Sequence, residues 1–85
     1  MYKIITRSSV EKDLKKIDKA SVKRIIEAIE SSLTESPRES GEPLKGKFKG
    51  LWKMYVVPYR VIYSIDNRAG TVVIEKIGHR KDVYR

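Results

Sequence analysis

The side chains of this chain that can take part in chemistry are mostly lysine, arginine and tyrosine, and they gather in residues 43–85. This half carries ten basic against three acidic residues and six of the seven aromatic residues, whereas residues 1–42 carry nine basic and eight acidic residues. No acidic residue occurs from Pro43 to Ile65. Such a basic field favours a polyanion or an acidic protein as the partner. A lysine-rich solvated surface is the alternative, but solubility alone does not require this asymmetry between the two halves.

Several standard catalytic sites are excluded by the residue types present. The sequence contains no P-loop and no glycine-rich GxGxxG motif followed by a helix. One histidine and no cysteine leave no metal-ligand spacing and no disulfide, so we expect neither a metal nor a cofactor. His79 lacks the nucleophile-elbow sequence that would support a hydrolase triad. The basic region also lacks a pair of carboxylates for acid/base catalysis.

Cleavage of RNA is one reaction that the remaining residue types suit. The 2′-hydroxyl of RNA supplies the nucleophile, so the protein has to align it with the phosphorus and stabilise the negative charge that develops. An arginine fork grips two phosphate oxygens, and a lysine crowded by other cations can act as a base. An aromatic ring can stack on a nucleobase for about 1–3 kcal/mol.

Three strands must position these side chains. Alternation of apolar and polar residues, bounded by turn residues, predicts strands over residues 51–57, 59–66 and 71–77. The short connections between them predict an antiparallel meander. Lys53 and Tyr55 share one face of the first of these strands, and Arg60 lies on the polar face of the next. We expect this face to be open, while the other face is covered by helices.

The first half of the chain predicts a short strand and a helical hairpin. Residues 2–6 are β-prone. Ser8 with Glu11 three residues later fits a capping box for a first amphipathic helix, and Asp18 is expected to cap a second one. The predicted order is β-α-α-β-β-β, an α+β domain in which the helical hairpin packs on an antiparallel sheet.

The loop over residues 37–50 joins the two halves and contains three glycines, two prolines and three lysines. Glycines beside lysines let a phosphate backbone approach closely, so these lysines are candidate RNA contacts. A flexible, solvated loop is an equally good interpretation.

Length and composition limit the domain organisation. A chain of 85 residues has room for one domain, residues 1–85, and its apolar (40%) and charged (35%) fractions suit a globular protein. No apolar run approaches the roughly 20 residues that span a bilayer, and the N-terminus lacks the shape of a signal peptide. We therefore expect a cytoplasmic protein without a membrane partner.

Four short sequence blocks follow one another across residues 44–85. They are Leu44-Lys45-Gly46, Gly50-Leu51-Trp52-Lys53, Tyr59-Arg60-Val61-Ile62-Tyr63 and Gly78-His79-Arg80-Lys81-Asp82-Val83-Tyr84-Arg85. In order and spacing these blocks resemble the RelE branch of the RelE/ParE toxin superfamily, the toxins of bacterial and archaeal toxin–antitoxin pairs. The resemblance implies the β-α-α-β-β-β fold and a toxin that cuts mRNA in the ribosomal A site. It also implies inhibition by an acidic, partly disordered antitoxin similar to RelB.

The resemblance further implies roles for individual residues. Lys53 falls at the position of a lysine implicated as the base, and Arg60 at an arginine that contacts the scissile phosphate. Arg80 falls at an arginine implicated in stabilising or protonating the leaving group. Tyr84 falls at a tyrosine that stacks on or orients the substrate. The basic field and the resemblance together give these RNA-binding candidates: Lys45, Lys47, Lys49, Tyr55, His79, Lys81 and Arg85.

The chain departs from the family pattern in three ways. Tyr55 stands where RelE has a second lysine, and the segment between Arg80 and Tyr84 is shorter by about two residues. We also expect no glutamate in the strand region, where YoeB-like relatives use one as the base. A catalytically degenerate relative that only binds RNA or an antitoxin is therefore one alternative. A ParE-like inhibitor of DNA gyrase is the other, although such an inhibitor has no need of residues that grip phosphate.

Overall fold

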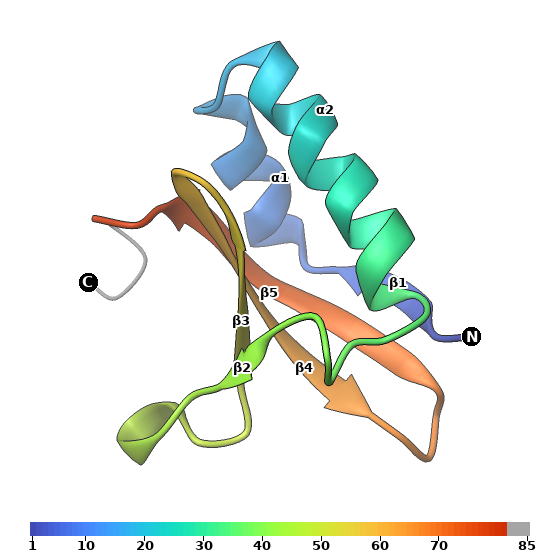
Figure 1. Cartoon of the computed structure of the whole chain (residues 1–85). Coiled ribbons are helices and arrows are strands. Elements are labelled where there is room, and N and C mark those ends of the chain that lie inside the picture. Colours follow the sequence, from blue (N-terminus) through green and yellow to red (C-terminus); the bar gives the residue numbers. More distant parts are fainter. Residues whose placement is uncertain (82–85) are drawn as a thin grey trace.

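The chain folds into a five-stranded sheet with two helices on one of its faces (Figure 1). A computed structural model describes residues 1–81. Its main elements, in chain order, are β1 (Lys3–Thr6), α1 (Ser8–Lys15), α2 (Lys19–Ala28), β2 (Glu42–Pro43), β3 (Trp52–Val56), β4 (Tyr59–Asp66) and β5 (Thr71–His79). A π-helical turn, Ile29–Leu33, continues α2, and a 3-10 turn, Gly46–Phe48, lies between β2 and β3. The strands lie in the order β1-β5-β4-β3-β2.

The predicted α+β architecture is confirmed, with two differences in the sheet: a fifth strand, β2, lies in the predicted loop, and β1 is parallel to its neighbour. β3, β4 and β5 form the predicted antiparallel meander, because only short turns connect them. β1 pairs with β5 in parallel, so the sheet is mixed and not wholly antiparallel. This pairing joins the two ends of the sequence, and local sequence pattern carries no information about such a long-range partner.

The hydrophobic core lies between the helices and the sheet. α1 contributes Val10 and α2 contributes Ile25, while β4 contributes Val61 and Tyr63, all of which are fully buried. Val61 and Tyr63 are two residues apart and therefore share the face that the helices cover. Burying an apolar side chain of this size stabilises a fold by about 1.5–3 kcal/mol. This packing fixes which face of the meander points away from the helices.

The two helices begin in different ways. The carboxylate of Asp18 accepts a hydrogen bond from the backbone N–H of Ser21 at 3.0 Å, so the predicted cap of α2 is confirmed. Hydrogen bonding from the Ser21 side chain, and next from this backbone N–H, lowers the pKa of Asp18. The capping box predicted at Ser8 and Glu11 is wrong, because α1 already begins at Ser8 and Arg7 precedes it without a side-chain cap. The backbone N–H of Arg7 instead donates to the carbonyl of Ile74 at 3.3 Å, so β1 runs directly into the helix.

The face of the sheet opposite α1 and α2 is called the open face below. Its side chains alternate with the core residues of β3, β4 and β5, and they include Lys53, Tyr55, Arg60, Ile62, Ser64, Val73 and Lys76. Glu75 of β5 also reaches this face, where its carboxylate accepts a hydrogen bond from the Ser64 hydroxyl. Within residues 1–81, no helix is long and apolar enough to cross a membrane.

Candidate active site

Three of the residues predicted from the sequence lie together on the open face. Arg60 is directly opposite Tyr55 in the ladder between β3 and β4, and Lys53 lies two residues before Tyr55 on β3. Opposite residues of an antiparallel pair share a face, as do every second residues along one strand. The meander therefore gathers one tyrosine and two cations in a single patch.

Tyr55 is the centre of this patch. The Nζ atom of Lys53 lies 5.4 Å from the centroid of the Tyr55 ring, and the Cζ atom of Arg60 lies 5.1 Å from it. Both distances are within the range of a cation–π interaction. Tyr55 is nevertheless 47% exposed, so part of the ring is accessible to a ligand. A ring held between two cations can stack on a base while the cations bind the neighbouring phosphates.

The structure adds a carboxylate to the patch that the sequence analysis did not predict. Glu42 of β2 is paired with Lys53 of β3, and its Oε2 atom lies 3.9 Å from the Lys53 Nζ atom. The Glu42 side chain is 69% exposed, whereas that of Lys53 is only 21% exposed. The expectation that no glutamate lies in the strand region is therefore wrong, and it also overlooked Glu75, which lies within the predicted strand over residues 71–77. Glu42 could not be recognised as a strand residue from the sequence, because β2 has only two residues and is defined only by its pairing with β3.

Close packing holds the segment before β2 against β3. The hydroxyl of Tyr63 donates a hydrogen bond to the carbonyl oxygen of Pro37 at 2.6 Å. Gly41 passes so close to the Tyr63 hydroxyl and to the carbonyl of Lys53 that a Cβ atom would clash with both. A small cavity of about 160 Å³ remains between residues 39–42 and residues 53–55. The buried tyrosine and the glycine thus determine where Glu42 lies relative to Lys53.

The three lysines of the loop lie beyond the start of β3. Lys45, Lys47 and Lys49 are all exposed, and they surround the 3-10 turn Gly46–Phe48. The backbone N–H of Leu44 donates to the carbonyl of Leu51 at 2.8 Å, which closes the loop at its base. The Nζ atom of Lys47 lies 5.3 Å from the centroid of the Phe48 ring. The loop therefore extends the basic surface from the Lys53 end of the patch.

Arg80 and His79 occupy different sides of the end of β5. Arg80 is exposed and directly follows the strand, and its backbone N–H donates to the carbonyl of Pro58 at 3.0 Å in the β3–β4 turn. His79 is opposite Tyr59, and the two rings make an edge-to-face contact at 6.0 Å on the helix side of the sheet. The structure therefore brings the Arg80 backbone to the Arg60 end of the patch, whereas it separates His79 from the patch by the sheet itself.

The imidazole of His79 has a defined local partner. Its Nδ1 atom accepts a hydrogen bond from the backbone N–H of Lys81 at 3.3 Å, and Lys81 is exposed. Tyr84 and Arg85, which were also predicted as site residues, lie outside the described residues. The roles of all these residues in binding or catalysis stay predictions.

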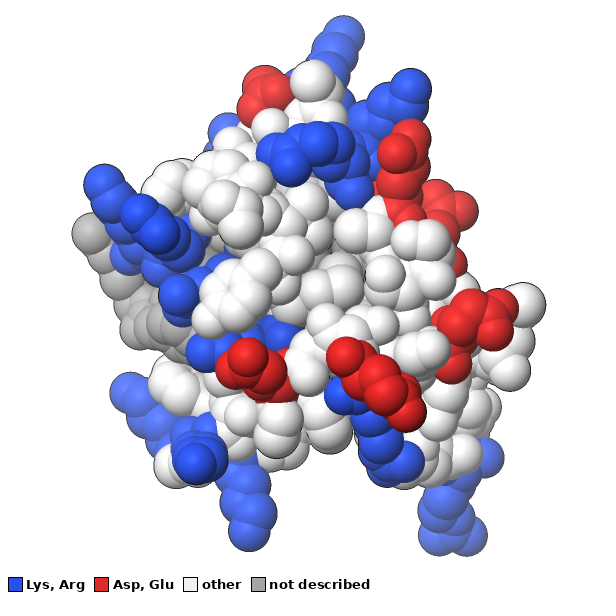
Figure 2. Space-filling view, viewed as in Figure 1, with Lys and Arg blue, Asp and Glu red and all other residues white. Residues whose placement is uncertain are grey.

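Charge is unevenly distributed over the surface. In the view of Figure 2 the acidic side chains lie mainly on the right, where the helices lie in Figure 1, and in the lower centre. Lysine and arginine side chains project from the left side, the top and the bottom of the same view.

A two-helix hairpin on this mixed sheet, with a cationic patch on the open face, defines the class of protein. Residues 4–84 match the family described as the ParE toxin of the type II toxin-antitoxin system parDE. The chain belongs to this family, and it is a type II toxin of the RelE/ParE superfamily.

Individual relatives place the chain more narrowly within the superfamily. It is 30% identical to Toxin RelG of Mycobacterium tuberculosis (strain ATCC 25618 / H37Rv) over 84 residues, which cover 99% of this chain and 97% of RelG. It is 27% identical to Toxin RelE of the same strain, covering 99% of this chain and 87% of that toxin. The crystal structure of the toxin-antitoxin complex RelBE2 from Mycobacterium tuberculosis matches with a TM-score of 0.88 and 28% identity, covering 93% of this chain and 98% of that chain. Toxin RelE of E. coli, bound to a peptide of the antitoxin RelB, shares the fold with a TM-score of 0.74, covering 92% of this chain and 82% of that chain at 20% identity.

Proposed function

We propose that this toxin is an endoribonuclease that cuts mRNA in the ribosomal A site by attack of the 2′-hydroxyl. The observation that carries the proposal is the patch of Lys53, Tyr55 and Arg60 on the open face, with Glu42 at ion-pair distance from Lys53. The patch combines phosphate-binding cations, a stacking surface and two groups that can accept a proton. These are the functions that RNA cleavage without a metal requires.

The proposed reaction uses each group at a defined step. The 2′-oxygen forms a bond to the phosphorus while the bond from phosphorus to the 5′-oxygen breaks, which leaves a 2′,3′-cyclic phosphate and a 5′-hydroxyl. The proton of the 2′-hydroxyl passes to the Glu42 carboxylate, or to the Lys53 amine after the Lys53 ammonium has first released a proton to solvent. Arg60 stabilises the charge on the phosphate oxygens, and Arg80 stabilises the departing 5′-oxygen until it takes a proton from water. The ring of Tyr55 stacks on a base and fixes the strand.

The relatives support a toxin that is bound by a protein partner. Two of them are named as the toxins RelG and RelE, and the solved structures include toxins in complex with RelB antitoxins. We propose that this toxin is likewise bound by an acidic, RelB-like antitoxin that folds on the basic surface. The ribosome and its mRNA are the targets, so the toxin acts in the cytoplasm.

The description of the matching family favours a second candidate function. That family is described as the ParE toxin of parDE, and a toxin that inhibits DNA gyrase by binding would not require catalysis. A catalytically degenerate RNA or antitoxin binder is the third candidate, because Tyr55 replaces a lysine of RelE. A DNA supercoiling assay separates gyrase inhibition from both RNA-based functions.

Substitution of the phosphate-binding arginines tests the proposed function. Arg80→Ala and Arg60→Ala should each lower the rate of mRNA cleavage by about 10²–10³-fold, because each removes a group that stabilises charge in the transition state. Circular dichroism should show that the fold is retained. Arg68→Ala is the matched control, since Arg68 is an exposed cation in the turn at the opposite end of β4.

The controls distinguish two failures of this proposal. Normal cleavage by Arg80→Ala would remove Arg80 from the site. An equal loss in Arg68→Ala would show that only total charge matters and that the patch is not an active site.

A further inference from the structure

A second lysine occupies the open face beyond the patch, and the sequence analysis did not include it. In the ladder between β3 and β4, Lys53 is opposite Ile62, and in the ladder between β4 and β5, Ile62 is opposite Lys76. Lys53 and Lys76 therefore lie in one row across the sheet, separated by two strand spacings, or about 10 Å. The adjacent row contains Tyr55, Arg60 and Gly78.

The apolar side chain of Ile62 lies at the centre of the row, between the two lysines. Ile62 is only 4% exposed although it lies outside the core cluster and on the open face. Its cross-strand neighbours are lysines, whose aliphatic stems can cover apolar surface while the ammonium groups remain in water. The row thus places two cations on either side of a buried apolar side chain. This arrangement suits contact with two phosphates of one RNA strand.

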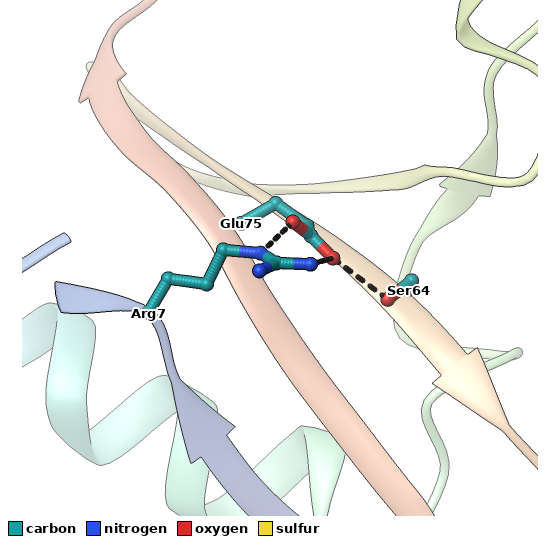
Figure 3. Close-up of polar contacts among 3 residues, drawn as sticks. All are labelled: Arg7, Ser64 and Glu75. Atoms are coloured by element: carbon teal, nitrogen blue, oxygen red, sulfur yellow. Dashed lines mark hydrogen bonds and ion pairs between the residues drawn. The ribbon is translucent and has the colours of Figure 1, made fainter. Parts of the chain in front are cut away.

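A carboxylate next to Lys76 is held by other residues. Glu75 precedes Lys76 at an irregularity in the register of β5, and it forms an ion pair with Arg7, which follows β1 (Figure 3). The Oε2 atom of Glu75 also accepts a hydrogen bond from the Ser64 hydroxyl at 3.0 Å. Arg7 therefore neutralises Glu75, the only acidic side chain of β5 within the described residues. Glu75 consequently does not compensate the positive charge of Lys76.

The row ends at an edge of the sheet that β1 does not cover. β1 pairs with β5 only as far as Thr6 and Ile74, whereas β5 continues to His79. At this edge Asp13 of α1 accepts a hydrogen bond from the backbone N–H of Ile77 at 3.1 Å. A cavity of about 660 Å³ lies beside it, and its lining includes Lys16, Lys76 and His79.

We propose that Lys76 binds the RNA phosphate next to the scissile one, and that the strand leaves the open face over this edge of β5 toward Lys16. The inference rests on the proposed function, because it extends the binding surface of the same substrate. It assigns the direction of the strand as across the sheet, from β3 to β5. It also gives a role to the Arg7–Glu75 ion pair, in which Arg7 neutralises the Glu75 carboxylate and so prevents its repulsion of that phosphate.

Binding of a single-stranded RNA that is 2′-O-methylated, and so cannot be cleaved, tests the inference. Fluorescence anisotropy over a range of salt concentrations would give the dissociation constant of each variant. Lys76→Gln and Lys16→Gln should each weaken binding about three- to tenfold and reduce the salt dependence by about 0.7 in log Kd per log salt, the value of one phosphate contact on a single strand. Lys23→Gln, at an exposed lysine on α2, should change neither quantity.

A charge-balanced pair of variants tests the role of Arg7. Arg7→Gln should weaken binding because it leaves Glu75 as an uncompensated carboxylate beside Lys76. Arg7→Gln combined with Glu75→Gln should restore wild-type binding, because the net charge of the pair is again zero. A double variant that binds as weakly as Arg7→Gln would contradict this role.

The outcomes separate the inference from the proposed function. If wild-type protein binds RNA with a steep salt dependence and Lys76→Gln behaves like Lys23→Gln, the inference is wrong and the proposed function stands. If wild-type binding is absent or does not respond to salt, the open face is not an RNA surface and the proposed function itself is contradicted.

Discussion

Tyr55 is the residue at which this toxin differs most from the RelE pattern in its site. A second lysine at this position would add a third cation beside Lys53 and Arg60, whereas the tyrosine places an aromatic ring between them. The ring attracts both cations through its negative face, and 47% of the residue stays exposed. On the proposed function, the chain therefore exchanges a phosphate contact for a stacking contact at the same point of the substrate.

Tyr63 supports the site from inside the core. Its side chain is fully buried, and burial raises its pKa to about 12. The pKa in the unfolded chain is about 10, so the folded state keeps the proton between these values while the unfolded state loses it. The stability that this difference represents is present below about pH 10 and is lost as the pH rises towards 12. The loss should be about 2–3 kcal/mol.

Denaturant unfolding of wild-type protein and Tyr63→Phe at several pH values measures this effect. At neutral pH the variant should be less stable by about 1–3 kcal/mol, because the carbonyl of Pro37 loses its hydrogen-bond donor. Above pH 10 the difference between the two proteins should shrink, since phenylalanine does not titrate. A difference that stays constant up to pH 12 would show that Tyr63 does not titrate with a raised pKa.

At the scale of elements, the short strand β2 depends on Gly41. A Cβ atom on residue 41 would meet both the hydroxyl of Tyr63 and the backbone carbonyl of Lys53. Gly41→Ala should therefore lower the free energy of unfolding by about 1–3 kcal/mol and move Glu42 away from Lys53. Chemical denaturation measures the first effect, and the cleavage rate at constant protein concentration measures the second.

A double variant identifies which contact matters at Gly41. Tyr63→Phe removes the hydroxyl but leaves the carbonyl of Lys53, which belongs to the backbone of β3 and cannot move independently. Gly41→Ala combined with Tyr63→Phe should therefore remain destabilised relative to Tyr63→Phe alone. Full recovery in the double variant would mean that the hydroxyl is the only obstacle.

The elements also show which parts of the fold could be predicted from the sequence. The strands β3, β4 and β5 were predicted because alternation and turn residues are local signals, and their antiparallel order followed from the short connections. Their register, with its irregularity between Ile62 and Tyr63, was not predicted. The parallel partner of β1 and the two residues of β2 were not predicted, since both are defined only by distant pairing. The capping box at Ser8 failed for the same reason, because a backbone bond to β5 sets the start of α1.

The candidate site divides in the same way. Lys53, Tyr55 and Arg60 could be grouped from the sequence because they lie on adjacent strands of a meander. Glu42 and Lys76 required the pairing of β2 and of β5, which sequence periodicity does not provide. His79 was grouped with the patch by its nearness to Arg80 in sequence, but consecutive residues at a strand end point to opposite sides of the sheet.

At the scale of the whole molecule, charge asymmetry is the main feature that relates fold to function. The net charge is +8, and nearly all of this excess belongs to residues 43–85, which form the loop and the meander. A concentrated positive field steers the molecule toward a polyanion and raises its rate of association, particularly at low salt. The ribosome is such a polyanion, so alignment by the ribosome would supplement a site that lacks a strong acid/base pair.

The most direct test of the central claim is primer extension on an mRNA in a translating extract, with and without the purified toxin. The account predicts new 5′ ends that follow the codon frame and disappear when ribosomes are removed. Intact mRNA at toxin concentrations that stop translation in the extract would contradict the account, and frame-independent cuts that persist without ribosomes would contradict its assignment to the A site.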